Sequence, residues 1–519
     1  MMQKIIAAAA AALICGLIWA GMPEKAEAAA ESAAGKINTN GMSDEDDVRL
    51  LQTWLLTGQD AQLSDWQRFD LNHDSRLDAG DLTAVKRLLL QNPDRTAPPV
   101  RVLAPSLPSV GNVRIPVFAV SFPDCSFPAD AAEALEARCF SGAAPEDSLY
   151  PRESVSAYFD RASYSRIKLC GDVIRYTAKH PIDDYAVDHA QSLAAEIAEA
   201  LDAQLDYQVY DADNDRRLDA FVIALPDSAI KIDRDGDGKP DWWPFSGASV
   251  NRGQFDGLHL GDYCVLVYDD RNPADFVGKA AHELCHAMGL PDYYRYTADK
   301  FGENDGMQGP AGYELMDEGS GDLSACSKLL LGWLSADEVQ IYSGGIQTFS
   351  LLSMQDAPSC VLIPKEPDAG FLSEYFLIEY VTKAGNDSAV GGNGIRILHV
   401  QAEVSAGKHG MEFTYNNYGQ HYEQSNEKQR VLRLVNESGM FYPGKNGLQY
   451  TDCITGDVPG FHWYDADGAL TLDPGVQIKF DSFQPGPDFE PDPLSSRNYQ
   501  DYPSFRKGSR FEITVSELE

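Results

Sequence analysis

The apolar positions between residues 272 and 288 follow a helical spacing. They form one stripe of a helix with about 3.6 residues per turn and comprise Val277, Ala280, Ala281, Leu284 and Met288. Asn272 suits the N-cap, and Pro273 suits the first helical position. Gly289 can adopt the left-handed conformation that ends a helix, and Pro291 blocks any continuation. The pattern therefore predicts a helix here and a reversal of the chain after Gly289.

Other stretches form short apolar or alternating runs of the kind found in strands. Upstream of the helix, they predict strands at Val113–Ser121, Ile167–Tyr176, Phe221–Leu225 and Tyr263–Tyr268. Between these strands, the segment from Gln191 to Leu205 repeats leucine and isoleucine at helical spacing and predicts a second helix. Strands interleaved with helices indicate a mixed α/β domain, which we place at residues 113–334.

The chain after residue 334 shows only short strand-like runs, separated by Gly, Pro, Asn and Asp. Examples are Tyr375–Tyr380, Gly394–Val400, Arg430–Val435 and Phe511–Val515. This pattern predicts a β-rich, sandwich-like C-terminal domain at residues 335–519. The histidines of this region are dispersed, so we interpret them as structural or surface residues: His399, His409, His421 and His462.

The first 28 residues have the pattern of a secretory signal peptide. Lys4 supplies a positive charge, an apolar stretch runs from Ile5 to Ala20, and Ala26-Glu27-Ala28 offers a cleavage site. An uncleaved anchor is the alternative, because no charge falls between Ile5 and Pro23. No later segment is long and apolar enough to span a bilayer. We expect an exported protein, with a small polar linker at 29–42 and a Pro-rich linker at 93–112.

Composition excludes some classes of partner. The 519 residues include 42 basic and 79 acidic side chains, a net charge of −37. This argues against binding to nucleic acid or to an anionic membrane surface, both of which attract basic patches. Solubility is the simplest reason for the acidity, and metal binding accounts for part of it.

Eight cysteines follow the signal. Disulfides are possible in an exported protein, for instance between Cys125 and Cys139, and free thiols are the alternative.

The predicted helix at residues 272–288 carries the motif His-Glu-x-x-His. Residues four apart lie on one helix face, so His282 and His286 can direct their imidazoles at one metal ion. Glu283 can take a proton from a metal-bound water. The chain reversal can deliver Asp292 as a third ligand, which leaves the open position typical of a catalytic zinc site. The alternative is a chance motif on an ordinary surface helix.

Three acidic loops have the ligand spacing of calcium loops. The first supplies oxygen side chains at loop positions 1, 3, 5, 9 and 12 and precedes a helix; these residues are Asp70, Asn72, Asp74, Asp78 and Asp81. The second places carboxylates at positions 1, 3, 5 and 9, namely Asp211, Asp213, Asp215 and Asp219. The third repeats that spacing at Asp233, Asp235, Asp237 and Asp241. Solvated acidic turns are the alternative for all three loops.

Residues 43–92 resemble a dockerin, the small calcium-folded module that binds cohesin domains on scaffold proteins. The resemblance rests on the loop from Asp70 to Asp81 and on the helix from Asp47 to Thr57. The first of the two dockerin repeats keeps its helix but lacks a proper loop. The resemblance therefore implies a helical module with one calcium ion and a cohesin as a possible partner.

Residues 114–333 resemble the catalytic domain of the immune-inhibitor-A family of secreted bacterial metallopeptidases. The resemblance rests on Pro116–Asp124, Ser154–Tyr164, the Asp211 loop, the zinc motif ending at Asp292, and Leu315-Met316 with Leu331-Gly332-Trp333. It implies a metzincin-like fold in which Asp292 is the third zinc ligand and Met316 lies in a turn beneath the metal. A lone methionine is, by itself, an ordinary core residue. The family's usual propeptide is replaced here by the dockerin-like module.

The sequence thus predicts a multidomain α+β protein that acts as a secreted zinc endopeptidase. Its parts are a dockerin-like module, a metzincin-like zinc peptidase domain and a β-sandwich-like domain. The module would tether the enzyme to a cohesin-bearing scaffold at the cell surface or in a cellulosome-like assembly. Two other functions stay open, namely a non-catalytic scaffold component and a scaffold enzyme that degrades cell-wall polysaccharide.

Overall fold

A computed structural model describes residues 105–518 with gaps. The longest gaps cover residues 232–241, 248–253, 295–312, 416–430, 436–452, 464–474 and 485–508. The chain divides into two compact units, Met1–Ala97 and Pro98–Glu519, and every described residue lies in the second unit. The predicted signal peptide, the dockerin-like module with its Asp70–Asp81 loop, and the acidic loop from Asp233 to Asp241 therefore lie outside the described residues.

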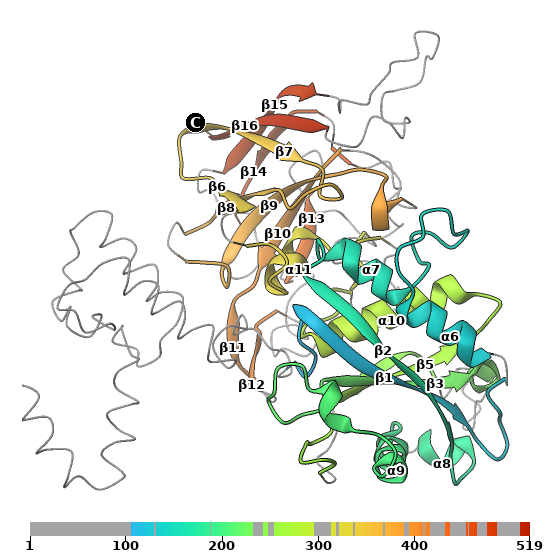
Figure 1. The fold of residues 1–519 in the computed structure, drawn as a ribbon. Helices are drawn as coiled ribbons and strands as arrows, with labels where there is room; N and C mark the ends of the chain where they lie inside the picture. The colour runs from blue at the N-terminus through green and yellow to red at the C-terminus, as the bar shows by residue number, and fades with distance from the viewer. Residues whose placement is uncertain are drawn as a thin grey trace, which may run out of the picture. The chain divides into compact units, whose positions relative to one another are not determined.

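The first part of the described chain is built on a five-stranded sheet (Figure 1). Its strand order is β2 (Ile167–Thr177), β1 (Gly111–Ser121), β3 (Ala220–Pro226), β5 (Asp262–Tyr268) and β4 (Phe245–Gly247). The pairings are parallel except that of the edge strand β4 with β5. Each of the four strands predicted upstream of residue 272 is confirmed. Strand β3 is buried along its whole length, as expected when both faces of a parallel sheet are covered.

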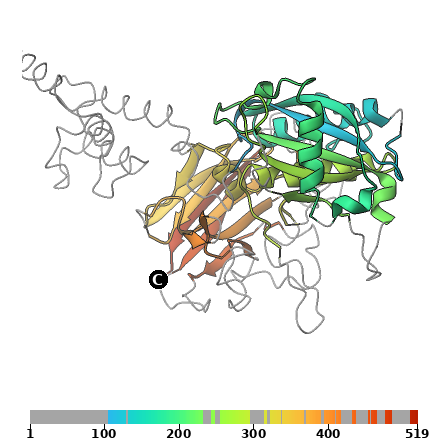
Figure 2. The same cartoon turned by 90° about the horizontal axis from the view of Figure 1, so that it is seen from below.

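Helices cover the two faces of this sheet (Figures 1 and 2). One face packs against α6 (Ala131–Phe140), α7 (Val155–Ala162) and α10 (Pro273–Ala287), and the other against α8 (Ile182–Ala186) and α9 (Gln191–Leu201). Strand β1 shows why both faces are apolar: Val117 and Ala119 enter the first core, whereas Phe118 and Val120 enter the second. Both predicted helices are confirmed, although α9 ends before Leu205.

The second part of the described chain forms two facing sheets. The five-stranded sheet has the order β13 (Leu432–Val435), β10 (Gly394–Gln401), β9 (Glu374–Val381), β8 (Cys360–Pro364) and β6 (Val339–Ile341). The four-stranded sheet has the order β14 (Val458–Phe461), β15 (Val476–Gln484), β16 (Arg510–Glu517) and β7 (Ile346–Leu352). A small hairpin pairs β11 (Val404–Gly407) with β12 (Gly410–Phe413). One apolar core lies between the two large sheets, which is the predicted sandwich-like arrangement.

The two parts share a continuous core, which the predicted boundary at residue 334 does not reveal. On β9, Phe376 and Ile378 enter the sandwich core, whereas Tyr375 and Leu377 join the core of the first part. The helix α11 (Ala325–Leu330) packs against β9, and Figure 1 shows it where the two parts meet. Residues 98–519 therefore form one unit, in which the predicted domain boundary is not a boundary of packing.

Two further expectations are changed by the structure. The Pro-rich linker was predicted to run to residue 112, but Ser106 and Leu107 are buried, and Leu107 N donates to Ala287 O at 3.1 Å. The last part of that linker is thus an integral segment of the folded body. The eight cysteines after residue 28 are free thiols, so the possible bridge between Cys125 and Cys139 is absent. Among the described helices, none is both long and apolar enough to cross a membrane.

Candidate metal centre

The C-terminal half of α10 positions the two histidines of the motif. The helix ends at Ala287, and Gly289 follows with φ of +100°, a left-handed conformation that disfavours side chains with a Cβ atom. Gly289 N donates to His286 O at 2.8 Å, and Leu290 N donates to Cys285 O at 3.0 Å. These bonds close the helix end and turn the chain back, as predicted, so that Asp292 returns toward the histidines.

The structure brings His282, His286 and Asp292 together. One ligand atom from each residue lies within 4.8 Å of the others. Asp292 Oδ1 is 2.9 Å from His282 Nε2 and 3.3 Å from His286 Nε2. The two imidazole rings stand nearly perpendicular, with centroids 4.8 Å apart. Two nitrogen donors and one carboxylate oxygen thus converge on one point, which is a ligand set of a catalytic zinc site.

The opposite ring nitrogens determine which tautomer each histidine adopts. His282 Nδ1 lies 2.9 Å from Leu315 O, and His286 Nδ1 lies 2.8 Å from Leu290 O. Because a carbonyl oxygen can only accept, each Nδ1 carries a proton and donates it. In the neutral rings, both Nε2 lone pairs therefore face the carboxylate of Asp292. Three electron-pair donors at such short range need protons or a cation between them, and two imidazoles with one carboxylate are a donor set that could hold Zn²⁺.

The electrostatics of the site show the same requirement for positive charge. Burial favours the neutral form of Asp292, but the facing imidazoles of His286 and His282 outweigh it and hold its pKa well below the ordinary value. Burial lowers the pKa of His286, but Asp292 outweighs this effect and raises it to about 9. The pKa of His282 is also raised, because Asp292 overcomes its burial. Without a metal, protons supply the positive charge that these groups need.

Glu283 is placed beside the histidines on the same helix. Glu283 is only 6% exposed, and α10 packs against β5 and the edge strand β4. Burial raises the pKa of Glu283, and the nearby imidazoles of His286 and His282 lower it less than burial raises it. A carboxylate that is poised above its ordinary pKa is a better proton acceptor at neutral pH than an exposed one.

Met316 lies in a buried turn that contacts His282 and Tyr293, the residue after Asp292. Asp317 N donates to Glu314 O at 2.9 Å and closes the turn, in which Met316 is fully buried. The carbonyl of Leu315, in the same turn, accepts from His282. Tyr293 N, adjacent to the third ligand, donates to Met316 O at 2.9 Å. Met316 thus lies in a turn whose backbone contacts His282 and the residue after Asp292.

The acidic loop before β3 forms a second group of possible metal ligands. Asp211, Asp213 and Asp215 each offer an oxygen within 4.8 Å of the others. Asp219 is fully buried; its Oδ2 accepts from Ala212 N at 3.0 Å, whereas its Oδ1 has no hydrogen-bond partner within the described part of the chain. Burial raises the pKa of Asp219 to about 8, and the carboxylates around it add to that effect. Four acidic groups at one loop are suited to a bound cation.

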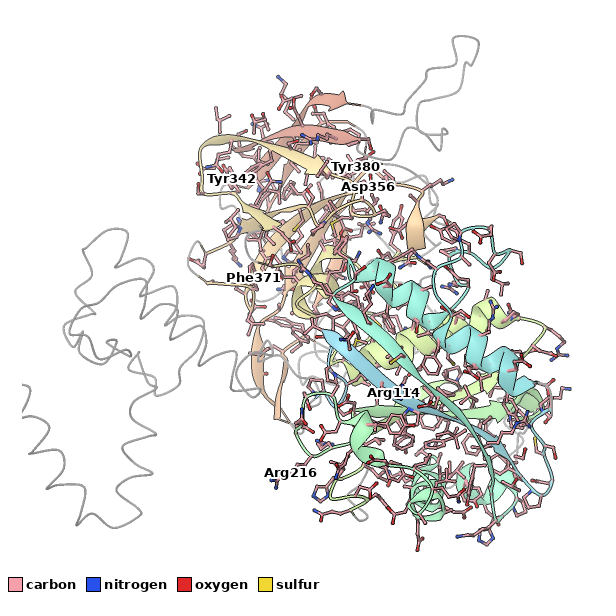
Figure 3. The ribbon with its side chains drawn as sticks, viewed as in Figure 1. Arg114, Arg216, Tyr342, Asp356, Phe371 and Tyr380 are labelled. Carbon is pink, nitrogen blue, oxygen red and sulfur yellow. The ribbon has the colours of Figure 1, made fainter. Side chains whose placement is uncertain are left out.

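The backbone of this loop is arranged around its carboxylates. Asp215 N donates to Asp211 Oδ1 at 3.0 Å and to Asp213 Oδ1 at 3.1 Å. Asn214 and Arg216 adopt positive φ angles of 60° and 69°. Arg216, labelled in Figure 3, is exposed and belongs to the outer side of the loop. The carboxylates of Asp211, Asp213 and Asp215 therefore lie close together, and the last two of these residues are exposed.

Several residues around the cluster of His282, His286 and Asp292 were not predicted from the sequence. The carbonyl groups of Leu290 and Leu315 orient the histidines, but backbone atoms leave no sequence signal. Tyr294 stacks on His282, with ring centroids 6.4 Å apart. Its position two residues after Asp292 could have indicated this proximity. Glu314, two residues before Met316, is fully buried, and its acidic character in an apolar stretch was the available signal.

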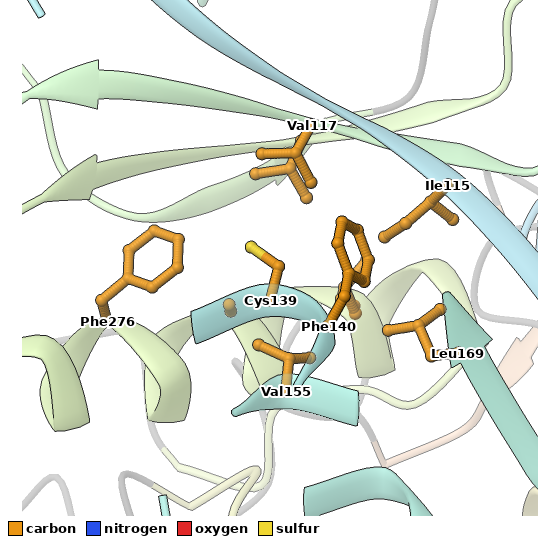
Figure 4. Close-up of a pocket in the computed structure, with 10 residues that line it drawn as sticks. Ile115, Val117, Cys139, Phe140, Val155, Leu169 and Phe276 are labelled. Atoms are coloured by element: carbon orange, nitrogen blue, oxygen red, sulfur yellow. The ribbon is translucent and has the colours of Figure 1, made fainter. Parts of the chain in front are cut away.

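The opposite side of α10 is packed without functional groups. A small apolar pocket lies between this helix and the sheet (Figure 4). The side chains that line it include Phe276, Ala280 and Leu284 from α10, and Cys139 and Phe140 from α6. The pocket therefore belongs to the apolar core, and neither His282 nor His286 lines it.

Comparisons with known proteins add little information about this site. No family model matches the chain, and no curated protein matches it. Solved structures that match include the crystal structure of catalytic inactive OgpA from Akkermansia muciniphila in complex with an O-glycopeptide (glycodrosocin) substrate. That match has 13% sequence identity and a TM-score of 0.26, and it covers 58% of this chain and 92% of that chain. A similarity this weak carries no conclusion about fold or activity.

Proposed function

We propose that the chain is a zinc-dependent endopeptidase. The observation that supports this best is the convergence of His282 Nε2, His286 Nε2 and Asp292 Oδ1, with both histidines oriented by backbone carbonyls. Glu283 stands beside them on α10 as the one carboxylate that the motif leaves for acid–base chemistry. The resemblance to the immune-inhibitor-A family, drawn from the sequence, agrees with this assignment and is itself part of the proposal.

The residues of the site have separate roles in this proposal. His282, His286 and Asp292 would hold the metal. Zn²⁺ bound there would lower the pKa of a coordinated water and polarise the scissile carbonyl. Glu283 accepts the proton of the attacking water and then delivers it to the leaving amine. Its raised pKa, which results from burial, matches this cycle of taking and releasing a proton.

The edge strand β4 gives a reason to expect a polypeptide substrate. Within the described residues, β4 pairs only with β5, and α10 packs against it. An extended peptide can add to a free sheet edge through main-chain hydrogen bonds, which are largely independent of its sequence. We infer that the substrate lies along β4 in extended form, with its scissile bond directed at the histidines of α10.

The test of the peptidase proposal combines a metal measurement with one substitution. We expect the purified protein to contain one zinc ion at this site and to cleave casein-like substrates in a chelator-sensitive manner. Glu283→Gln should retain the zinc and lower kcat by a factor of about 10²–10⁴, because the general base is lost.

The control is Glu133→Gln, an exposed glutamate on α6, which should behave as the parent protein does. Parent-like cleavage by the Glu283→Gln protein would exclude the proposed mechanism, and a zinc-free parent protein would exclude the proposed cofactor.

We also propose a structural Ca²⁺ ion at the loop from Asp211 to Asp219. The support comes from the fully buried Asp219 Oδ1 and from the three neighbouring carboxylates. Calcium prefers such carboxylate and carbonyl oxygens.

Export and attachment to a cohesin-bearing scaffold stay predictions of the sequence, because the residues on which they rest lie outside the described part of the chain.

A further inference from the structure

A buried carboxylate lies beneath the zinc-ligand cluster and is not part of the ligand set. Glu314 is fully buried, and both of its oxygens accept hydrogen bonds. Oε2 accepts from Met316 N at 2.5 Å. Oε1 accepts from Ser327 Oγ at 2.5 Å and from Ser324 N at 3.2 Å. One side chain therefore connects two segments of backbone, the methionine turn and the start of α11.

The first of these segments holds two zinc ligands in place. Leu315 O accepts from His282 Nδ1 at 2.9 Å and so sets the orientation of that imidazole. Met316 O accepts at 2.9 Å from the backbone N–H of Tyr293, the residue that follows Asp292. The turn therefore fixes one histidine through its ring and fixes the aspartate through the adjacent peptide group.

The second segment reaches the same ligands from another direction. Ser327 Oγ, which contacts Glu314, lies 3.0 Å from Tyr293 Oη. Ser324 is the N-cap of α11, and its side chain accepts from Ser327 N. The neighbouring Ala325 N donates to Glu379 Oε2 of β9 at 2.7 Å. Hydrogen bonds thus run from the C-terminal sheet through α11 and Glu314 to the turn beneath the zinc site.

We propose that Glu314 is the positioning residue of the zinc site, which orients His282 and Asp292 by fixing the methionine turn against α11. This inference rests on the proposed zinc site and extends it to a residue that contacts neither the metal nor the substrate. Partners outside the ligand set typically contribute about 10- to 100-fold to metal affinity. Glu314 would affect two ligands at once, because the turn contacts His282 directly and contacts Asp292 through the adjacent Tyr293.

A carboxylate is suited to this position, and its amide is not. Both oxygens of Glu314 face donors: a backbone N–H on one side, and a backbone N–H and a hydroxyl on the other. Glutamine has the same length but places an NH₂ group against one of these donors, so one bond becomes a repulsive contact. Glu314→Gln therefore releases one of the two segments and keeps the volume of the side chain.

The experiment measures zinc binding and does not depend on peptidase activity. The metal-free parent and Glu314→Gln proteins are titrated with zinc against a competing chelator. The visible absorption of the Co²⁺-substituted forms reports the geometry of the ligands. We expect Glu314→Gln to bind zinc about 10- to 100-fold more weakly and to change the intensity of the Co²⁺ bands.

A second buried glutamate provides the matched control. Glu153 is 1% exposed, pairs with Arg161 at 2.6 Å and accepts from Ala144 N, all without contact to the zinc ligands. Glu153→Gln should lower thermal stability but leave the zinc affinity and the Co²⁺ spectrum unchanged. Equal loss of zinc affinity in both variants would show general destabilisation and overturn the positioning role.

A milder variant decides the question if Glu314→Gln does not fold. Ser327→Ala removes one bond to Glu314 and one to Tyr293, and it should weaken zinc binding by a smaller factor in the same direction. Parent-like zinc affinity in a folded Glu314→Gln protein, or in Ser327→Ala, would contradict the inference. A parent protein that binds no zinc would instead contradict the proposed function, so the two failures are distinguishable.

Discussion

A buried aspartate lies where the first described residues meet the five-stranded sheet that contains β5. Asp262, at the start of β5, is 4% exposed, and its backbone N–H donates to Ser106 Oγ at 2.9 Å. Burial raises the pKa of Asp262 to about 6, although hydrogen bonds from Ser106 and the charge of Arg217 lower it in part. The cost of burying this charge makes the stability of the fold depend on pH.

The sign of that dependence follows from the raised pKa. The stability that Asp262 contributes to the fold is fully present below its unfolded pKa of about 4. It is lost as pH rises through the folded pKa of about 6, because the buried carboxyl group then ionises. Asn cannot ionise, so Asp262→Asn avoids this loss. Between pH 4 and pH 7, the unfolding free energy of the variant should rise relative to the parent by up to about 3 kcal/mol. Denaturant unfolding at both pH values measures the difference, and a constant difference would contradict the prediction.

The sequence predicts which side chains converge at the end of α10 but not the atoms that orient them. His282, His286 and Asp292 could be predicted because a helix repeat and a glycine stop determine their relative positions locally. Glu314 could not be assigned a role, because its partners on α11 lie ten or more residues away in the chain and meet it only after folding. Local spacing predicts what shares a helix face, whereas contacts between loops depend on the tertiary fold.

At the scale of elements, the end of α10 determines how the chain brings Asp292 back to the two histidines. Gly289 has a φ of +100°, and a Cβ atom there would meet Pro105 only at ordinary contact distance. The cost of a side chain is therefore conformational and not steric. Gly289→Ala should lower stability by about 1–2 kcal/mol and weaken zinc binding, because the strained turn displaces Asp292.

Gly142 provides the control for this substitution. It is exposed, has no left-handed conformation, and has open space where a Cβ would lie. Gly142→Ala should leave both the melting temperature and the zinc affinity close to those of the parent. If thermal unfolding and chelator competition show no difference between the two alanine variants, the helix end does not position Asp292.

The loop before β3 is the second element whose predicted role, calcium binding, can be tested. With zinc kept saturating, added Ca²⁺ should raise the melting temperature of the parent, by an amount equivalent to about 2.7 kcal/mol at a hundred times its dissociation constant. Asp213→Asn removes one of the clustered carboxylates and should reduce this response. Because the dockerin-like module stays unchanged in the variant, the difference isolates the loop. An identical calcium response in both proteins would exclude an ion there.

The elements themselves were largely predictable, and their pairing was not. Strands β1, β3 and β5 appear as apolar runs because they are buried on both faces. The short edge strand β4 has only three residues, too few for a periodic signal, and it was missed. Its identity depends on pairing with β5, which no local pattern specifies.

At the scale of the whole molecule, the strand β9 joins the two parts. The strand was predicted at Tyr375–Tyr380, but the sequence could not show that all eight residues of β9 are buried, two glutamates included, or that each face has a different partner. One face belongs to the sandwich core and the other to the core around α10. Glu379 of β9 also pairs with Arg396 at 2.7 Å and accepts from the start of α11.

This shared core predicts how truncated chains behave. A fragment of residues 98–519 keeps the whole of the second unit and should unfold cooperatively and bind zinc as the full chain does. A fragment of residues 98–334 loses β9 and leaves the apolar surface around α11 exposed to water. It also loses the acceptors of two buried backbone N–H groups, because Ala325 N donates to Glu379 and Asp322 N donates to Asp387 in the full chain. It should show no cooperative transition in thermal unfolding and should bind zinc at least about tenfold more weakly. A short fragment that unfolds cooperatively with the parent's zinc affinity would show that the catalytic part folds alone, and that the C-terminal sheets do not support the site.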